Sequence, residues 1–108
     1  MSDSSSNPIS IRVLVFQGCP NDQPTIALIK EVLRERGLAA SVDRVEVTAE
    51  TAAELRFLGS PTVQVNGTDI EPAARARTAF GLSCRTYPGT GGVPPRALVE
   101  QAIGAAKG

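Results

Sequence analysis

The chain contains no histidine and only two cysteines among its 108 residues. The absence of histidine excludes Ser-His and Cys-His nucleophilic pairs, zinc sites that need imidazole, and the commonest general base. Two cysteines cannot form a disulfide scaffold, and in a reducing cytosol such thiols stay free or serve catalysis, redox sensing or soft metals. Any chemistry must therefore depend on thiols, carboxylates and backbone groups.

The chain also lacks an excess of charge, because 11 Lys and Arg residues balance 11 Asp and Glu residues. Nothing marks it as a binder of polyanions, so nucleic acid is not an expected partner. No apolar run approaches the roughly 20 residues that span a bilayer. Residues 1–8 lack the basic and apolar regions of a signal peptide. We expect a cytoplasmic protein that contacts neither nucleic acid nor a membrane.

What is present suits one small domain. Residues 1–8 are polar and Ser-rich and are predicted to be a disordered tail, which leaves 9–108 as the domain. Ile11 to Phe16 form a nearly continuous apolar run, typical of a strand buried on both faces of a sheet. The pattern that follows predicts a helix ending at Arg36, with Gly37 as its stop.

Further elements follow from local signals. Ala40 to Val47 alternate as in a strand, and Thr48 can cap a short helix that runs through Leu58. Asn66-Gly67 is a strong hairpin signal, which predicts antiparallel strands at Val63 to Val65 and Thr68 to Ile70.

Residues 71–95 are irregular, with room for a short helix near 73–79 and an extended segment at 83–87. Pro94-Pro95 then opens a last helix. The predicted order is β-α-β-α-β-β-α, with a mixed four-stranded sheet and helices on both faces, a three-layer α/β/α arrangement.

Cys19 lies where the first strand ends and the first helix begins, the place where ligands and reactive groups gather in α/β sheets. The free amides of a helix N-terminus favour thiolate over thiol. The alternative is an inert, buried cysteine in a tight turn. We favour a nucleophile, because the neighbours Gln17-Gly18 and Pro20-Asn21-Asp22 are turn residues that belong near the surface.

Two strings, Phe16-Gln17-Gly18-Cys19-Pro20 and Gly59-Ser60-Pro61-Thr62, resemble the two signatures of the thioredoxin-like superfamily. The resemblance implies that Cys19 is the nucleophile and that Pro61 is a cis-proline that aligns extended partners. The substrate-binding positions that it implies are Pro20, Ser60, Pro61 and Thr62. Asp22 holds the position of the usual second cysteine, so resolving a mixed disulfide needs a thiol from elsewhere, and Cys84 is the internal candidate.

A closer resemblance is to small bacterial thioredoxin-like proteins sometimes labelled alkylmercury lyase. The strings that carry it are Gly18-Cys19-Pro20-Asn21, Gly59-Ser60-Pro61-Thr62 and Gly81-Leu82-Ser83-Cys84-Arg85-Thr86-Tyr87. That resemblance implies a soft-metal thiolate pair of Cys19 and Cys84, with Asp22 as proton donor. Asp22 also fits the role of a helix N-cap, and Cys84 also fits the core of an added strand.

The leading hypothesis is a cofactor-free thiol redox protein, in which Cys19 attacks a thiol or disulfide partner and Cys84 or an external thiol resolves the product. The alternatives are mercury binding or organomercurial cleavage by Cys19, Cys84 and Asp22, and a non-catalytic thioredoxin-like binding module. A further set of residues, Arg75, Arg77 and Arg85, either holds an anionic thiol or consists of solvated surface charges.

Overall fold

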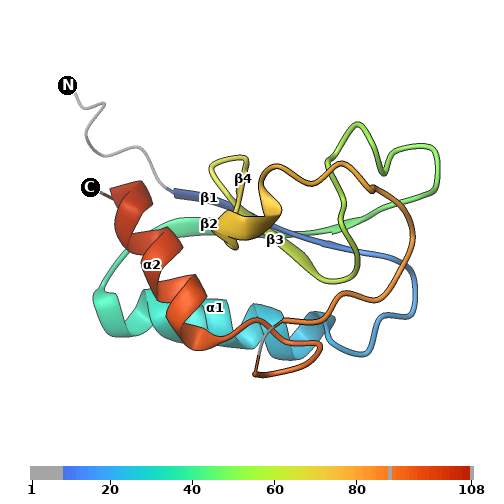
Figure 1. Ribbon diagram of the computed structural model, residues 1–108. Helices are drawn as coiled ribbons and strands as arrows, with labels where there is room; N and C mark the ends of the chain where they lie inside the picture. Colours follow the sequence, from blue (N-terminus) through green and yellow to red (C-terminus); the bar gives the residue numbers. More distant parts are fainter. Residues whose placement is uncertain (1–8, 88, 108) are drawn as a thin grey trace.

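The computed structural model describes residues 9–87 and 89–107, so the predicted tail lies outside the described residues. Four strands form one mixed sheet in the order β2-β1-β3-β4, and two α-helices pack against it (Figure 1). The elements are β1 (Ile9–Val15), α1 (Asp22–Arg36), β2 (Ala40–Glu46), β3 (Thr62–Val65), β4 (Thr68–Asp69), the 3-10 helix η2 (Pro72–Ala74) and α2 (Arg96–Lys107). The α/β class and the mixed four-stranded sheet are as predicted.

Strand β1 is central, and its second half, Val13 to Val15, is apolar and buried on both faces. It pairs parallel with β2 and antiparallel with β3, so that Ile11 lies between Val42 and Val65. Parallel neighbours need a crossover connection, and α1 provides it.

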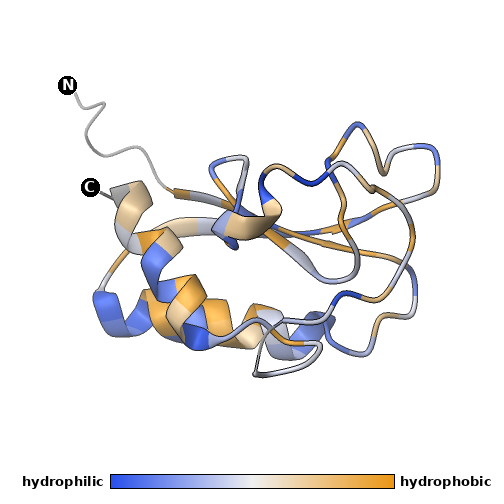
Figure 2. Ribbon diagram, in the orientation of Figure 1, coloured by the Kyte–Doolittle hydropathy of each residue, from blue (hydrophilic) through white to orange (hydrophobic). Residues whose placement is uncertain are grey.

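Helix α1 ends where the sequence predicted. Gly37 adopts a left-handed φ of 65°, and its N–H donates to the carbonyl of Arg34. The inner face of the helix buries Ile29, Val32 and Leu33. Figure 2 shows α1 with both apolar and hydrophilic stretches, as expected for a helix with one buried side. Among the described residues, no helix combines the length and apolar character needed to cross a bilayer.

The predicted hairpin is also present. Asn66 and Gly67 have φ angles of 52° and 83°, the pair of positive values that a two-residue type I′ turn requires. Strands β3 and β4 therefore run antiparallel, with Val65 opposite Thr68.

The core has one part on each face of the sheet. On one face, alternate residues of β1 pack with both helices, which also contact each other (Figure 1). On the opposite face, Leu14 packs with Val47, Ala52 and Phe57.

The segment that covers this second face corrects one prediction. The expected helix from Thr48 to Leu58 is a series of turns over residues 49–56. The Thr51 hydroxyl accepts from the N–H of Thr48 at 3.0 Å, as at the start of a helix, but the segment forms only turns. The physical reason is Arg56, whose φ of 58° interrupts any right-handed helix just before the buried Phe57.

The three-layer α/β/α prediction is therefore wrong in its third layer, which consists of turns and not of a helix. Gln64 of β3 fastens this layer to the sheet. Its amide nitrogen donates to the carbonyl of Leu55 at 2.9 Å, and its oxygen accepts from Arg12 at 2.8 Å.

Candidate functional site

Cys19 lies in a tight connection between β1 and α1. Gly18 takes a φ of 85°, which favours glycine, and the N–H of Cys19 donates to the carbonyl of Phe16 at 3.3 Å. The turn directs Cys19 inward, where it joins the helix-covered core with only 5% of its surface exposed. The expectation that its turn neighbours belong near the surface is met by Gln17, Gly18 and Pro20, which are all exposed.

Helix α1 begins three residues after Cys19. Asn21 occupies the N-cap position without a side-chain capping bond, and its side chain lies against the backbone of Gly92. Asp22 is the first helical residue, so its predicted role as the N-cap is wrong. One of its oxygens accepts from the N–H of Gln23 at 2.6 Å.

The other oxygen of Asp22 accepts a hydrogen bond from Nε of Arg44 on β2 at 2.9 Å. This hydrogen bond holds the pKa of the Asp22 carboxyl below its ordinary value. Asp22 is therefore ionised at neutral pH, which argues against the alternative in which it donates a proton to a leaving carbon.

The second predicted string, residues 59–62, lies beside the Cys19 connection. The hydroxyl of Ser60 accepts from the N–H of Phe16 at 3.3 Å, which fixes this string against the end of β1. The Ser60–Pro61 peptide bond is cis, as the resemblance implied. The Thr62 hydroxyl donates to the carbonyl of Gly59 at 2.6 Å, so Thr62 is a buried structural residue.

Cys84 lies on the other side of Ser60. The N–H of Ser60 donates to the carbonyl of Ser83 at 2.7 Å, and the N–H of Arg85 donates to the carbonyl of Ser60 at 3.0 Å. Ser60 and Cys84 thus form an isolated parallel bridge, a pairing that the sequence did not predict. Gly59 permits this approach, because a Cβ there would lie 2.9 Å from the Cβ of Arg85.

Cys84 itself is exposed, and both cysteines are free thiols. The interpretation of Cys84 as a core residue is therefore wrong. No group of three or more His, Cys, Asp or Glu side chains suited to a metal ion occurs within 9–87 and 89–107.

Arg85 is the largest departure from the sequence interpretation, which treated it as a surface or ligand-binding charge. It is 4% exposed, and its guanidinium group binds both oxygens of Asp69 at 2.8 and 3.0 Å. It also donates to Glu71 at 2.9 Å and to the Thr62 hydroxyl at 3.2 Å. Burial disfavours the charged form, but the hydrogen bonds to Asp69 and Glu71 outweigh it and hold the pKa of Arg85 above its ordinary value.

The guanidinium of Arg85 also lies over the ring of Tyr87, with 4.6 Å between the guanidinium carbon and the ring centroid. The Tyr87 hydroxyl donates to the carbonyl of Pro61 at 2.7 Å. The Cys84 segment is thus fastened to β3 through its backbone and through two buried side chains. Sequence reasoning missed the carboxylates of Asp69 and Glu71, although their spacing of two residues after a β-strand signal indicated one shared face.

Comparison of the chain with protein-family models, with curated proteins and with solved structures found no match.

The first prediction concerns the buried ion group. Replacing Arg85 by Met leaves the carboxylates of Asp69 and Glu71 buried without their cation. We expect the free energy of unfolding, measured in urea, to fall by about 3–5 kcal/mol at neutral pH. The loss should shrink as the pH falls, because protonation removes the unpaired charges.

Arg34→Met, on the exposed side of α1, is the matched control and should change stability little. A loss below about 1 kcal/mol for Arg85→Met would contradict the structural role assigned to this group.

The second prediction concerns Tyr87, the one tyrosine in a chain without tryptophan, so that phenolate absorbance reports it alone. Burial raises the pKa of Tyr87 well above its ordinary value of 10.0, although Arg85 opposes the shift. Because the pKa of Tyr87 is higher in the folded than in the unfolded chain, the neutral phenol contributes to the free energy of unfolding. This contribution is complete below pH 10.0 and is lost as the pH rises toward the folded-state pKa. Spectrophotometric titration of the native and the urea-unfolded chain measures both values, and coincident curves would refute the assignment.

Proposed function

We propose that the chain is a thioredoxin-like thiol-disulfide redox protein in which Cys19 is the nucleophile. The observation that carries the proposal is the meeting of three segments at the carboxyl end of β1. The Cys19 connection, the Ser60–Pro61 string and the Cys84 segment adjoin there, joined by the bonds from Phe16 to Ser60 and from Ser60 to Ser83.

The topology supports the thioredoxin-like part of the proposal. A parallel β1-α1-β2 unit is followed by an antiparallel β3-β4 hairpin and a final helix, with the hairpin added on the β1 side. This arrangement is compatible with the fold that the two sequence strings imply.

The chemistry begins with loss of the Cys19 proton to solvent. The thiolate attacks one sulfur of a disulfide partner, forms a mixed disulfide and releases the other sulfur as a thiolate. A second thiolate, from Cys84 or an external thiol, then attacks the mixed disulfide and releases the reduced partner.

The reaction requires that a partner disulfide reach Cys19, which is only 5% exposed, whereas Cys84 is exposed. The loop that carries Cys19 must shift to let a partner sulfur reach it, and the turn at 17–18 is the part of the loop nearest solvent.

The test is disulfide exchange with oxidised glutathione, followed by mass spectrometry of the mixed disulfides. We expect Cys19 to react about tenfold faster than Cys84, because the proposal assigns the attack on the partner disulfide to Cys19. Cys19→Ser should abolish the fast phase, and Cys84→Ser should keep it.

Exchange confined to Cys84 in the native chain would refute the proposal and leave a binding module as the better interpretation. A parallel series with mercuric ion separates the metal-handling alternative. That alternative requires one ion per chain, protected by both thiols and lost in either Ser variant.

A further inference from the structure

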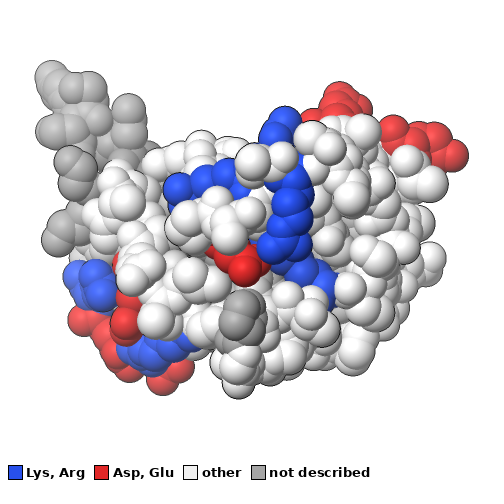
Figure 3. Space-filling view, viewed as in Figure 1, with Lys and Arg blue, Asp and Glu red and all other residues white. Residues whose placement is uncertain are grey.

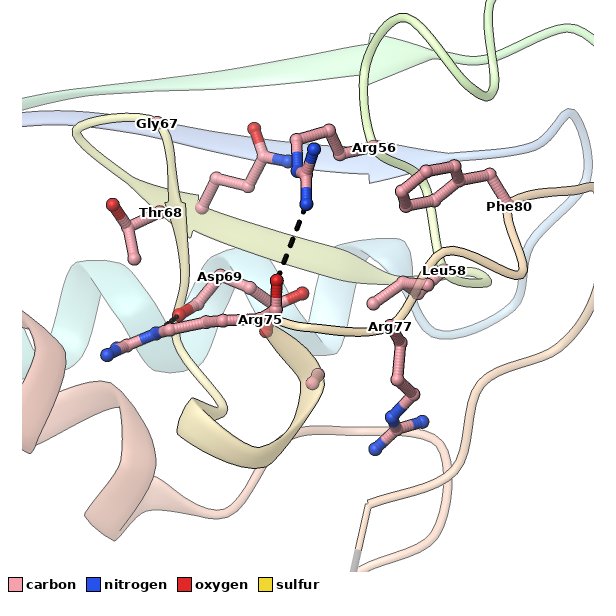
Figure 4. Close-up of a pocket in the computed structure, with 10 residues that line it drawn as sticks. Arg56, Leu58, Gly67, Thr68, Asp69, Arg75, Arg77 and Phe80 are labelled. Atoms are coloured by element: carbon pink, nitrogen blue, oxygen red, sulfur yellow. Dashed lines mark hydrogen bonds between the residues drawn. The ribbon is translucent and has the colours of Figure 1, made fainter.

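A pocket of about 210 Å³ lies beside the β3-β4 hairpin, and neither Cys19 nor Cys84 lines it. Its walls come from β3, β4, the turns before β3 and the segment after η2 (Figure 4). The residues that matter here are Arg56, Leu58, Thr68, Arg75, Arg77 and Phe80.

The charge around this pocket is unbalanced. The nearby carboxylates, Asp69 and Glu71, are bound to Arg85 at 2.8 and 2.9 Å. Arg77 reaches Glu71 only at 3.7 Å and is 53% exposed. The pocket region thus holds four arginines, which are Arg56, Arg75, Arg77 and Arg85. With only the two carboxylates of Asp69 and Glu71 beside them, the region has an excess of two positive charges. Figure 3 shows this as a band of basic side chains with a small acidic area between them.

Arg56 is one of the basic residues that line the pocket. Its guanidinium donates to the carbonyl of Arg75 at 3.4 Å and lies 5.4 Å from the centroid of the Phe80 ring (Figure 4). Within the described residues, no acidic side chain forms a salt bridge with Arg56 or Arg75.

The backbone of Arg56 is a second, independent observation. Its φ of 58° lies in the left-handed region that residues with a Cβ rarely adopt. Glycine would suit that conformation better, and residues held in such conformations cluster at binding and active sites.

We propose that this pocket binds a small polyanion, an oxyanion with two or more negative charges. The planar fork of an arginine matches the oxygens of phosphate and carboxylate groups. In Figure 4, Arg56 lies on one side of the pocket, and the side chains of Arg75 and Arg77 start at the opposite rim and point away from Arg56. Nε of Arg75 donates to the carbonyl of Asp69 at 2.8 Å, which holds this side chain at the rim. Arg77 is 53% exposed, and because exposed side chains rotate within nanoseconds it can turn toward a bound anion.

The rest of the pocket suits an organic anion. Leu58 and Phe80 give it an apolar side, and the exposed Thr68 carries a further hydrogen-bond donor on the opposite side. The inference does not depend on the redox proposal, because none of these residues takes part in the thiol chemistry.

The test is calorimetric titration of the full chain with inorganic pyrophosphate and, separately, with citrate, at one ionic strength maintained by sodium chloride. We expect saturable binding of one anion per chain. Pyrophosphate represents phosphate ligands and citrate carboxylate ligands, so the tighter of the two identifies the chemical class. Arg56→Gln should weaken binding about tenfold, and Arg34→Gln, which removes the same charge from the end of α1, should leave it unchanged.

Arg56→Gly separates binding from folding. It removes the guanidinium and suits the left-handed backbone, so the variant should unfold at a temperature no lower than that of the parent chain but bind the anion no better than Arg56→Gln. Absence of saturable binding to both anions would overturn the proposal. An equal loss in Arg34→Gln would also overturn it, because general surface charge would then explain the binding.

Discussion

The buried guanidinium of Arg85 is the group on which the arrangement of the loops depends. Its hydrogen bonds join the Cys84 segment to Asp69 of β4 and to Glu71, just before η2. An arginine in this position is stable only while its carboxylates are present, and the carboxylates are stable only while the arginine is. The long stretch after β4 therefore has a defined path although it contains almost no regular secondary structure.

This path determines the surroundings of the candidate site. Arg85 follows Cys84 directly, and the close approach at Gly59 lets their shared backbone pair with Ser60. Ser60 in turn bonds to the end of β1, which leads into the Cys19 connection. The hydrogen bonds of Ser60 thus connect the segment that carries the exposed Cys84 to the segment that carries the buried Cys19. A change in the Arg85 ion group would therefore alter the surroundings of both thiols.

The sequence predicted those parts of the fold that depend on local signals. The apolar run of β1, the glycine that ends α1 and the Asn66-Gly67 turn each specify their structure within a few residues. The predicted helix at 48–58 was wrong although the composition of this segment favours a helix. The burial of Phe57 and the left-handed backbone of Arg56 depend on contacts with the sheet, which local sequence does not specify. Arg85 could not be placed either, since its burial follows from two carboxylates 14 and 16 residues away.

The two outer strands of the sheet, β2 and β4, affect whether copies of the chain can associate through their strand edges. Strand β2 is an outer strand of seven residues, and its exposed positions carry Asp43, Arg44 and Glu46. The opposite outer strand, β4, is only two residues long, and its Asp69 is held inward by Arg85. Open strand edges recruit further strands when they are long, flat and uncharged. One edge here is charged and the other is short, so neither offers a template for edge-to-edge aggregation.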